Sequence, residues 1–291
     1  MQPPKIFDRG LLRRRLRRAA KDWSAHDFLR CEMVDRLADR LLDIDRDFGA
    51  GVELDARDSV LANHPAVRRR IKDLHQFAPV PLTPAVGLTP PPLLAVADSE
   101  MLPVADASQD VILAASGMHL LNDLPGSLLQ IRRALRPDGL FLGVMLGGDT
   151  LVELRQTLMA AELEIEGGVS PRVAPSIEIR DLGGLLQRAG FSLPVVDADR
   201  LTVTYDSVFG LFADLRGMAE TNILQERRRC FSRRQTFARM AELYQQRFQA
   251  EDGRLTASFE LLFMTAWAPG AGQQKPLKPG SGQTPLGDVL R

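Results

Sequence analysis

The sequence has few of the residues that stabilise a fold through disulfides or metal sites. Its 291 residues include two cysteines, Cys31 and Cys230, which are too few for a disulfide framework. So low a cysteine content is typical of a reducing compartment, and we expect a cytoplasmic protein. The four histidines share no metal-binding spacing, so no metal site is predicted. No apolar run approaches the roughly 18 residues that a membrane span needs.

The sequence also lacks net charge. Lys plus Arg and Asp plus Glu number 37 each, so no overall electrostatic field points to nucleic acid. The exception is RGLLRRRLRRAAK at residues 9–21. It has three interpretations: an organelle transit peptide, a contact with acidic lipid or nucleic acid, or the solvated face of a helix whose leucines turn inward. Asp8 and Asp22 flank it and favour the solvated helix, with at most a peripheral membrane or partner contact.

The clearest pattern lies between Asp110 and Thr150. Asp110–Ala115 and Leu140–Leu146 are short apolar runs, and Leu124–Leu135 has apolar residues at helical spacing. Arg-Pro-Asp-Gly at 136–139 stops the helix, because proline cannot continue it and glycine relieves the turn. Strand, helix and strand in this order predict a parallel sheet covered on both faces. Ligands of such sheets bind at the carboxyl ends of the strands, which here are followed by loops 116–123 and 147–150.

Further elements are predicted on both sides of this unit. Strands are expected at Val52–Ala56, Leu93–Ala97, Val195–Tyr205 and Thr256–Ala268, and Gly49–Gly51 is interpreted as a turn. Helices are expected at 23–45, Ser59–Leu74, Leu151–Glu166 (capped by Asp149 or Thr150), Ile179–Ala189, Ser207–Leu215 and Gln225–Ala250. The alternation indicates an α/β protein with a class I methyltransferase-type, Rossmann-like mixed sheet of seven strands. We expect an N-terminal helical extension at 1–45, the domain at 46–268 with lid helices at about 206–250, and a flexible tail at 269–291.

Eight motifs in order, from about Phe7 to Ser281, carry a resemblance to a known family. They are FDR (7–9), ADSEMLPVADAS (97–108), MHLLNDLPGSLLQIRRALRPDG (118–139), LGGDTLVELR (146–155), EGGVSP (166–171), DLGGLLQRAGF (181–191), DLRGMAETN (214–222) and QKPLKPGS (274–281). The chain resembles the methyltransferase-like complex I assembly factors of alphaproteobacteria and mitochondria, and more distantly the carboxyl methyltransferase of biotin synthesis. The resemblance implies a methyltransferase fold, S-adenosylmethionine as cofactor, and a protein partner or substrate, a subunit of complex I, that carries the arginine to be modified.

The chain departs from this family where the cofactor should bind. Family members follow the first strand with a D-x-G-x-G-x-G loop, whose glycines let the backbone approach the cofactor. Here the sequence reads VELDARDS at 52–59, with side chains in place of the glycines. The second strand should end in a carboxylate, but the corresponding run, APVPLTP at 78–84, has none. Two lost hydrogen bonds of roughly 1.5–3 kcal/mol each predict weak or absent binding. The departures cluster between Gly49 and Pro92, a pattern that a compensated frameshift would also produce.

Candidate site residues follow from this comparison. On the cofactor side the resemblance points to the acidic residue of the first strand, which aligns with Glu53 or Asp55, and to the acidic loop, with Asp98, Glu100 and Met101. On the substrate side we single out residues in the two loops after the central strands: Ser116, His119, Asn122, Gly147, Gly148 and Asp149. His119 is a potential general base near neutral pH, or else a packed and hydrogen-bonded residue. Asp149 can contact a ligand, cap a helix, or both.

Two functions therefore remain open from the sequence. One is an enzyme of the complex I assembly type that modifies a protein arginine. The other is a non-catalytic scaffold that keeps the fold and the lid but has lost the cofactor. A carboxyl methyltransferase is a more distant alternative.

Overall fold

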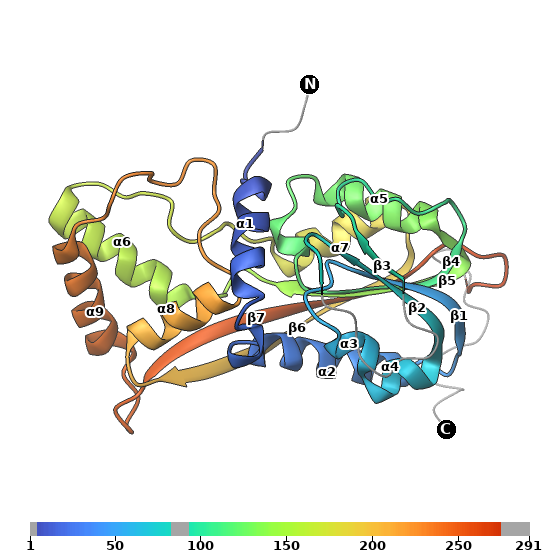
Figure 1. The fold of residues 1–291 in the computed structure, drawn as a ribbon, viewed down its shortest axis with the longest axis horizontal. Helices are drawn as coiled ribbons and strands as arrows, with labels where there is room; N and C mark the ends of the chain where they lie inside the picture. The colour runs from blue at the N-terminus through green and yellow to red at the C-terminus, as the bar shows by residue number, and fades with distance from the viewer. Residues whose placement is uncertain (1–4, 83–92, 275–291) are drawn as a thin grey trace, which may run out of the picture.

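Seven strands form one mixed sheet in the order β3-β2-β1-β4-β5-β7-β6 (Figure 1). The structure is a computed structural model that describes residues 5–82 and 93–274. Strand β7 runs antiparallel to both its neighbours, and the other adjacent pairs are parallel. The strands are β1 (Phe48–Leu54), β2 (Ile71–Ala78), β3 (Leu94–Val96), β4 (Gln109–Ala115), β5 (Leu135–Leu146), β6 (Ser192–Tyr205) and β7 (Leu255–Trp267). The predicted class I methyltransferase-type sheet is thereby confirmed.

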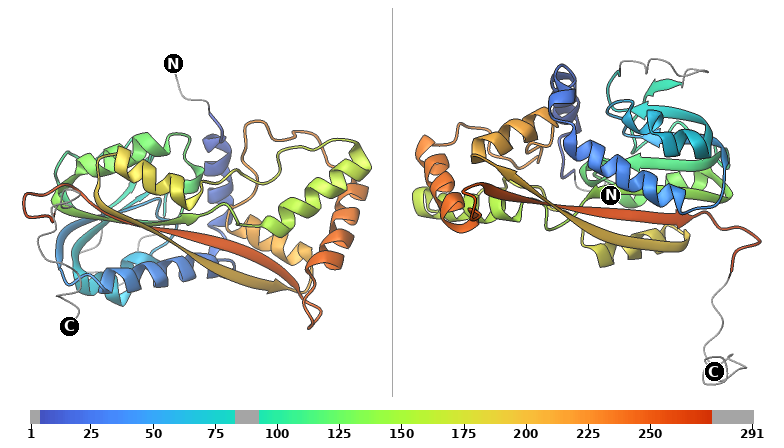
Figure 2. Two further views of the ribbon diagram at one scale, coloured as in Figure 1. Left: turned by 180° about the vertical axis from the view of Figure 1, so that it is seen from behind. Right: turned by 90° about the horizontal axis from the view of Figure 1, so that it is seen from below.

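Helices cover both faces of the sheet and form a separate group at one end (Figures 1 and 2). Helices α2, α3 and α4 lie on one face, and α5 and α7 on the other. The separate group consists of α6, α8 and α9 and is called the lid below, although α6 lies outside the range 206–250 expected for a lid. The long strands β6 and β7 reach it, and α1 stands between it and the sheet. Their bounds are α1 (Arg9–Ala19), α2 (Phe28–Leu42), α3 (Val60–Asn63), α4 (Pro65–Arg70), α5 (Leu124–Ala134), α6 (Val152–Glu166), α7 (Ile179–Arg188), α8 (Val208–Gly217) and α9 (Arg234–Phe248).

The alternation of side chains along the central strands divides the core into two clusters. Val111 and Leu113 of β4 face the layer of α2, whereas Ile112 and Ala114 face the layer of α5 and α7. All four are 0–1% exposed, as expected for a sheet buried on both faces. Helix α5 begins at the Asp123 carboxylate, which accepts a hydrogen bond from the Gly126 N–H at 2.8 Å. The βαβ unit therefore forms the framework on which the loops at the strand ends are held.

The second strand lies earlier in the chain than the sequence indicated. Residues 59–74 were expected to be one helix, but Pro65 starts a new short helix and β2 already begins at Ile71. The run from Ile71 pairs in parallel with β1, from Phe48↔Ile71 to Glu53↔Gln76. Strand β2 ends at Ala78 because Pro79 cannot donate a hydrogen bond to the ladder.

Three further local predictions were wrong. Gly49–Gly51 is part of β1 and not a turn, and a Cβ on Gly51 would come within 2.8 Å of the Val111 side chain. Neither Asp149 nor Thr150 caps α6, whose N-cap is Leu151 without a side-chain hydrogen bond. The helix expected at Gln225–Ala250 is shorter, since α9 begins only at Arg234.

The proposed division into an extension, a domain and a tail stays a prediction. Helix α2 of the expected extension packs on β4 and β5. Most of the tail and of the proline-rich run 77–92 lies outside the described residues. Within 5–82 and 93–274, no helix is long and apolar enough to cross a membrane.

Candidate functional site

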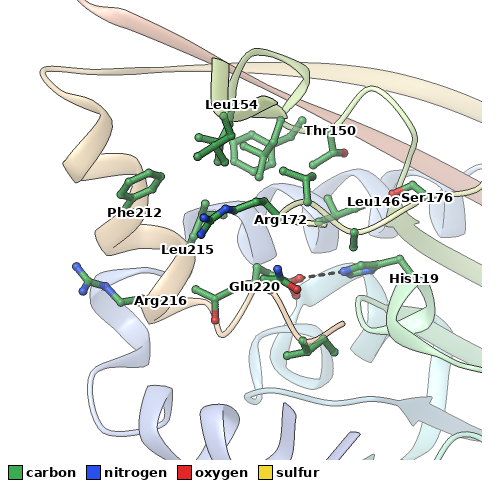
Figure 3. A pocket seen from close by; sticks show the side chains of 18 of the residues that line it. His119, Leu146, Thr150, Leu154, Arg172, Ser176, Phe212, Leu215, Arg216 and Glu220 are labelled. Atoms are coloured by element: carbon green, nitrogen blue, oxygen red, sulfur yellow. Dashed lines mark hydrogen bonds and ion pairs between the residues drawn. The ribbon is translucent and has the colours of Figure 1, made fainter. Parts of the chain in front are cut away.

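A cavity of about 440 Å³ lies between the lid and the carboxyl ends of β4 and β5 (Figure 3). Its walls are mainly apolar and come from the end of β5, from α6, from α8, from α9 and from β7. They include Leu146, Leu154, Phe212, Leu215, Phe237 and Phe259. A mostly apolar hollow with a few polar groups is typical of a binding site for an organic ligand.

The polar end of this cavity is a side-chain contact between the loop after β4 and the segment after α8. His119 follows β4, and Glu220 follows α8 in the DLRGMAETN motif. The His119 Nε2 atom lies 3.0 Å from Glu220 Oε2, and their side chains are 6% and 15% exposed (Figure 3). Burial alone would raise the pKa of Glu220, but contact with His119 and the charge of Arg57 lower it below its usual range. The cavity therefore contains a carboxylate that stays ionised near neutral pH.

Two arginines complete the polar lining. Arg172 is held in place, because its Nη2 lies 2.6 Å from Glu162 Oε1 and its guanidinium lies over the Phe237 ring at 5.5 Å. Arg216 is exposed, and Figure 3 shows it on the far side of Glu220 from His119. The cavity thus has a carboxylate at one end and guanidinium groups farther along it.

The loop after β1 is filled by its own side chains. Asp55 adopts a left-handed conformation with φ of 51°, a region that favours glycine. Asp55 and Arg57 are 4% and 8% exposed, so both side chains point into the protein. What remains beside Arg57 is a cavity of about 20 Å³, lined also by Ser116, His119 and Glu220. That is room for about one water molecule.

A buried charge network secures the end of β1. Glu53 is 0% exposed and accepts hydrogen bonds from Arg30 Nη2 at 2.5 Å and Gln76 Nε2 at 2.7 Å. Arg30 of α2 also donates to the carbonyl oxygen of Ala115. Asp58 accepts a hydrogen bond from Trp23 Nε1 at 2.8 Å. The Glu53 carboxylate at the end of β1 is therefore bound by side chains of the protein itself.

The acidic loop is engaged by helix α1. Asp98 accepts hydrogen bonds from Arg9 Nη2 at 2.7 Å and from Arg13 Nη2 at 2.5 Å. Glu100 Oε1 accepts one from the Asn122 backbone N–H at 2.5 Å. Met101 is 77% exposed and points away from the protein. In the described structure, the acidic loop thus holds the N-terminal helix α1 through Asp98.

The structure brings only some of the predicted substrate-side residues to the large cavity. His119 lines it, and Ser116 lines the small cavity beside Arg57. Asn122 instead holds Phe7, whose N–H donates to Asn122 Oδ1 at 2.7 Å.

The loop after β5 contributes Thr150 to the lining of the large cavity. Its predicted residues Gly147, Gly148 and Asp149 instead form hydrogen bonds through their backbone atoms. Gly147 N–H and Asp149 N–H donate to the carbonyl and the carboxylate of Glu260 at 2.9 and 3.1 Å. Gly148 accepts a hydrogen bond from Arg155 through its carbonyl at 3.0 Å. A Cβ on Gly147 would come within 2.3 Å of Glu260 Oε2, so this position needs glycine. The assignment of these residues to a substrate site stays a prediction.

Comparison with known proteins places the chain in a family. A methyltransferase domain model matches residues 75–143. "Arginine-hydroxylase NDUFAF5, mitochondrial" of Danio rerio is 37% identical over 98% of this chain and 90% of that protein. The chain belongs to the methyltransferase-like complex I assembly factors. A malonyl-[acyl-carrier protein] O-methyltransferase of Xylella fastidiosa is 35% identical over 91% of the chain and 89% of that enzyme. A Bacillus halodurans protein assigned as a methyltransferase shares the fold, with a TM-score of 0.53, 16% identity, and coverage of 81% and 98%.

The comparison confirms the resemblance on which the sequence analysis relied, and it corrects one prediction. The chain is a member of the complex I assembly factor family within the class I methyltransferase superfamily. The expected cytoplasmic location is wrong, because the family's similar proteins are named mitochondrial. Low cysteine content is typical of a reducing compartment but does not separate one such compartment from another.

Family membership implies S-adenosylmethionine, so we asked whether the residues present fit it. They do not. Arg57 and Asp55 fill the place that the family's glycines leave open, and Glu53 at the end of β1 is bound by Arg30 and Gln76. Asp98, the adenine-side candidate, is bound by Arg9 and Arg13. In the described part of the chain, no group of three or more His, Cys, Asp or Glu is arranged to hold a metal ion.

Two residues that matter here were not singled out from the sequence. Glu220 lies inside a quoted family motif, and its helix-to-loop position gave no reason to prefer it to Asp214 or Asn222. Arg57 was noted only as a replaced glycine. The signal that the sequence offered was a positive charge, Arg57, in the cofactor loop together with an acidic residue, Glu220, in the motif at 214–222.

Proposed function

We propose that the chain acts in the assembly of respiratory complex I by binding a polypeptide segment at the lid cavity. In this proposal an arginine side chain of the partner pairs with Glu220, and S-adenosylmethionine is not used. The observation that carries it is the contrast between an open substrate cavity of about 440 Å³ and a filled cofactor crevice.

Charge supports a cationic side chain at this end of the cavity. Glu220 is the carboxylate in the lining of this cavity, and a guanidinium can form two parallel hydrogen bonds with a carboxylate. The names of the related arginine hydroxylases fit a family that handles arginine side chains.

The apolar walls suit the remainder of a peptide. A cavity of this size exceeds what a single side chain fills, and its leucine and phenylalanine lining favours aliphatic neighbours of the arginine. Arg216, exposed beyond Glu220, is available to backbone carbonyls or to an acidic residue of the same segment. We therefore expect an arginine flanked by apolar residues.

The second candidate is an enzyme that modifies this arginine with S-adenosylmethionine. The match to a methyltransferase domain and the contact between His119 and Glu220, which can accept a proton, favour it. The carboxyl methyltransferase alternative has support in the Xylella fastidiosa relative. Both require the cofactor, and both therefore meet the same filled crevice.

Genetic complementation tests the proposal. In a host that lacks the gene, NADH oxidation by complex I in isolated membranes is measured after expression of the wild type, Glu220→Gln or Glu164→Gln. Glu164 lies on the exposed face of α6, paired with Arg239, and serves as the matched control. We expect the wild type and Glu164→Gln to restore complex I and Glu220→Gln to fail. Full restoration by Glu220→Gln would refute a role for this carboxylate.

Binding experiments separate the two candidates. Calorimetric titration of the wild type with S-adenosylmethionine should give no binding in the micromolar range. Overlapping peptides of the complex I subunits should bind where they contain arginine, and citrulline at the same position should weaken binding by on the order of tenfold to a hundredfold. A low-micromolar affinity for S-adenosylmethionine would instead establish the enzyme.

A further inference from the structure

Arg57 occupies an unusual position for an arginine. It follows β1 in the loop where the family has glycine, it is 8% exposed, and neither Nη atom has a hydrogen-bond partner among the described residues. An ordinary buried guanidinium is paired, as Arg30 is with Glu53. Among the described residues, the carboxylates that favour the charged form of Arg57 are those of Asp55 and Glu220, which form no hydrogen bond with its Nη atoms.

The small cavity beside Arg57 is shared with one of these carboxylates. Its lining includes Arg57, His119 and Glu220; His119 and Glu220 also line the large cavity, and Arg57 lines the small one alone. Burial lowers the pKa of Arg57, and the carboxylates of Asp55 and Glu220 oppose that shift. Arg57 and Glu220 thus stabilise each other's charged form across a space that holds about one water molecule.

We propose that Arg57 is a positioning residue that replaces the cofactor. Its guanidinium fills the crevice where the superfamily holds S-adenosylmethionine, and it supplies the positive charge that the sulfonium of that cofactor would supply. It acts through Glu220, which it keeps ionised and fixed against the sheet. The lid cavity can then bind its ligand when no cofactor is bound. The inference rests on the proposed function only for the identity of the ligand that Glu220 receives.

The electrostatic surroundings of Glu220 make the proposal measurable. His119 faces it from the loop after β4, Arg57 and Asp55 from the loop after β1, and Arg216 lies on its own segment. Arg30 lines the same small cavity but is bound by Glu53, whereas the Nη atoms of Arg57 have no hydrogen-bond partner among the described residues. A carboxylate that loses a positively charged neighbour titrates at higher pH.

The experiment is a pH titration of the Glu220 carboxyl carbon by ¹³C NMR in the intact protein. Glutamate labelled at the side-chain carboxyl is incorporated, and the Glu220 resonance is the one missing from Glu220→Gln. We expect Arg57→Met to raise the pKa of Glu220 by about one unit or more, equivalent to a tenfold change in its ionisation. Arg57→Lys, which keeps the charge, should leave the pKa close to that of the wild type.

The outcomes separate positioning from packing and from the proposed function. If Glu220 titrates alike in the wild type and Arg57→Met, Arg57 only fills space and the proposal is wrong. Should Arg57→Met not fold, Arg57→Gln provides the same neutral test with a polar group. The resonance is read without any ligand, so a failure of the arginine peptides to bind would overturn the proposed function and leave this result standing.

Discussion

The two halves of the carboxyl edge of the sheet differ in how much space they leave for a ligand. At the ends of β1 and β3, arginines bind Glu53 and Asp98, and a cavity of about 20 Å³ lies beside Arg57 in the loop after β1. At the ends of β4 and β5 the lid covers a hollow of about 440 Å³ with an ionised carboxylate in its wall. The same fold thus keeps its substrate half while its own side chains fill its cofactor half.

The core explains how one half can change without the other. The strands are held by two hydrophobic clusters on opposite faces of the sheet, to which the buried β4 residues contribute on both sides. None of the residues 55–59 belongs to either cluster, although Leu54 and Val60 on either side of the loop do pack there. Substitutions there alter the crevice and its charges while the apolar area buried by the sheet stays the same.

The largest expected effect tests whether the cofactor half has become structural. Arg30→Met leaves Glu53 buried without its charged partner, and it should lower the free energy of unfolding by about 3–5 kcal/mol. Chemical denaturation measures the change. Arg133→Met is the control, because Arg133 is 60% exposed in its pair with Asp106 and should cost less than about 1 kcal/mol. Equal small losses for both variants would show that the network at the end of β1 contributes nothing.

A smaller effect tests what closes the crevice. The combined substitutions Asp55→Gly, Arg57→Gly and Ser59→Gly restore the family's loop, and they should tighten binding of S-adenosylhomocysteine at least tenfold, or by about 1.4 kcal/mol. Isothermal titration calorimetry measures the affinity. Ser59→Gly alone is the control, since Ser59 is only partly buried and its removal opens no space at Arg57. A folded triple variant that binds no better than Ser59→Gly would place the obstruction elsewhere, at the end of β2.

The smallest effect concerns the acidic loop. Asp98→Asn removes the charge that binds Arg9 and Arg13, and its side chain is 26% exposed, so we expect a loss of about 0.5–1 kcal/mol. Complex I should still assemble in the complementation assay. Asp106→Asn, at 66% exposure, is the control for a surface carboxylate. If Asp98→Asn abolished assembly while the protein remained folded, the acidic loop would have to retain a ligand, and the contrast between the halves would fail.

Periodicity predicted the central unit of the fold well, and it failed where short-range signals conflict. Strand β4 and helix α5 have apolar residues at spacings that only one element satisfies. The run 59–74 contains helix formers up to Arg70 and then a strand whose pairing with β1 decides its state. Gly51 belongs to a strand because it pairs with Leu74 of β2 and Val111 of β4, segments far from it in the sequence.

The sequence alone determined the family, the central strand–helix–strand unit and the loss of the cofactor glycines, because each is written in consecutive residues. Only the tertiary structure decided what took their place. Arg30 and Glu53 are 23 residues apart, Arg9 and Asp98 are 89 apart, and His119 and Glu220 are 101 apart. Charges so distant along the chain interact only when the fold removes them from water and holds them together, where a low effective dielectric strengthens their attraction.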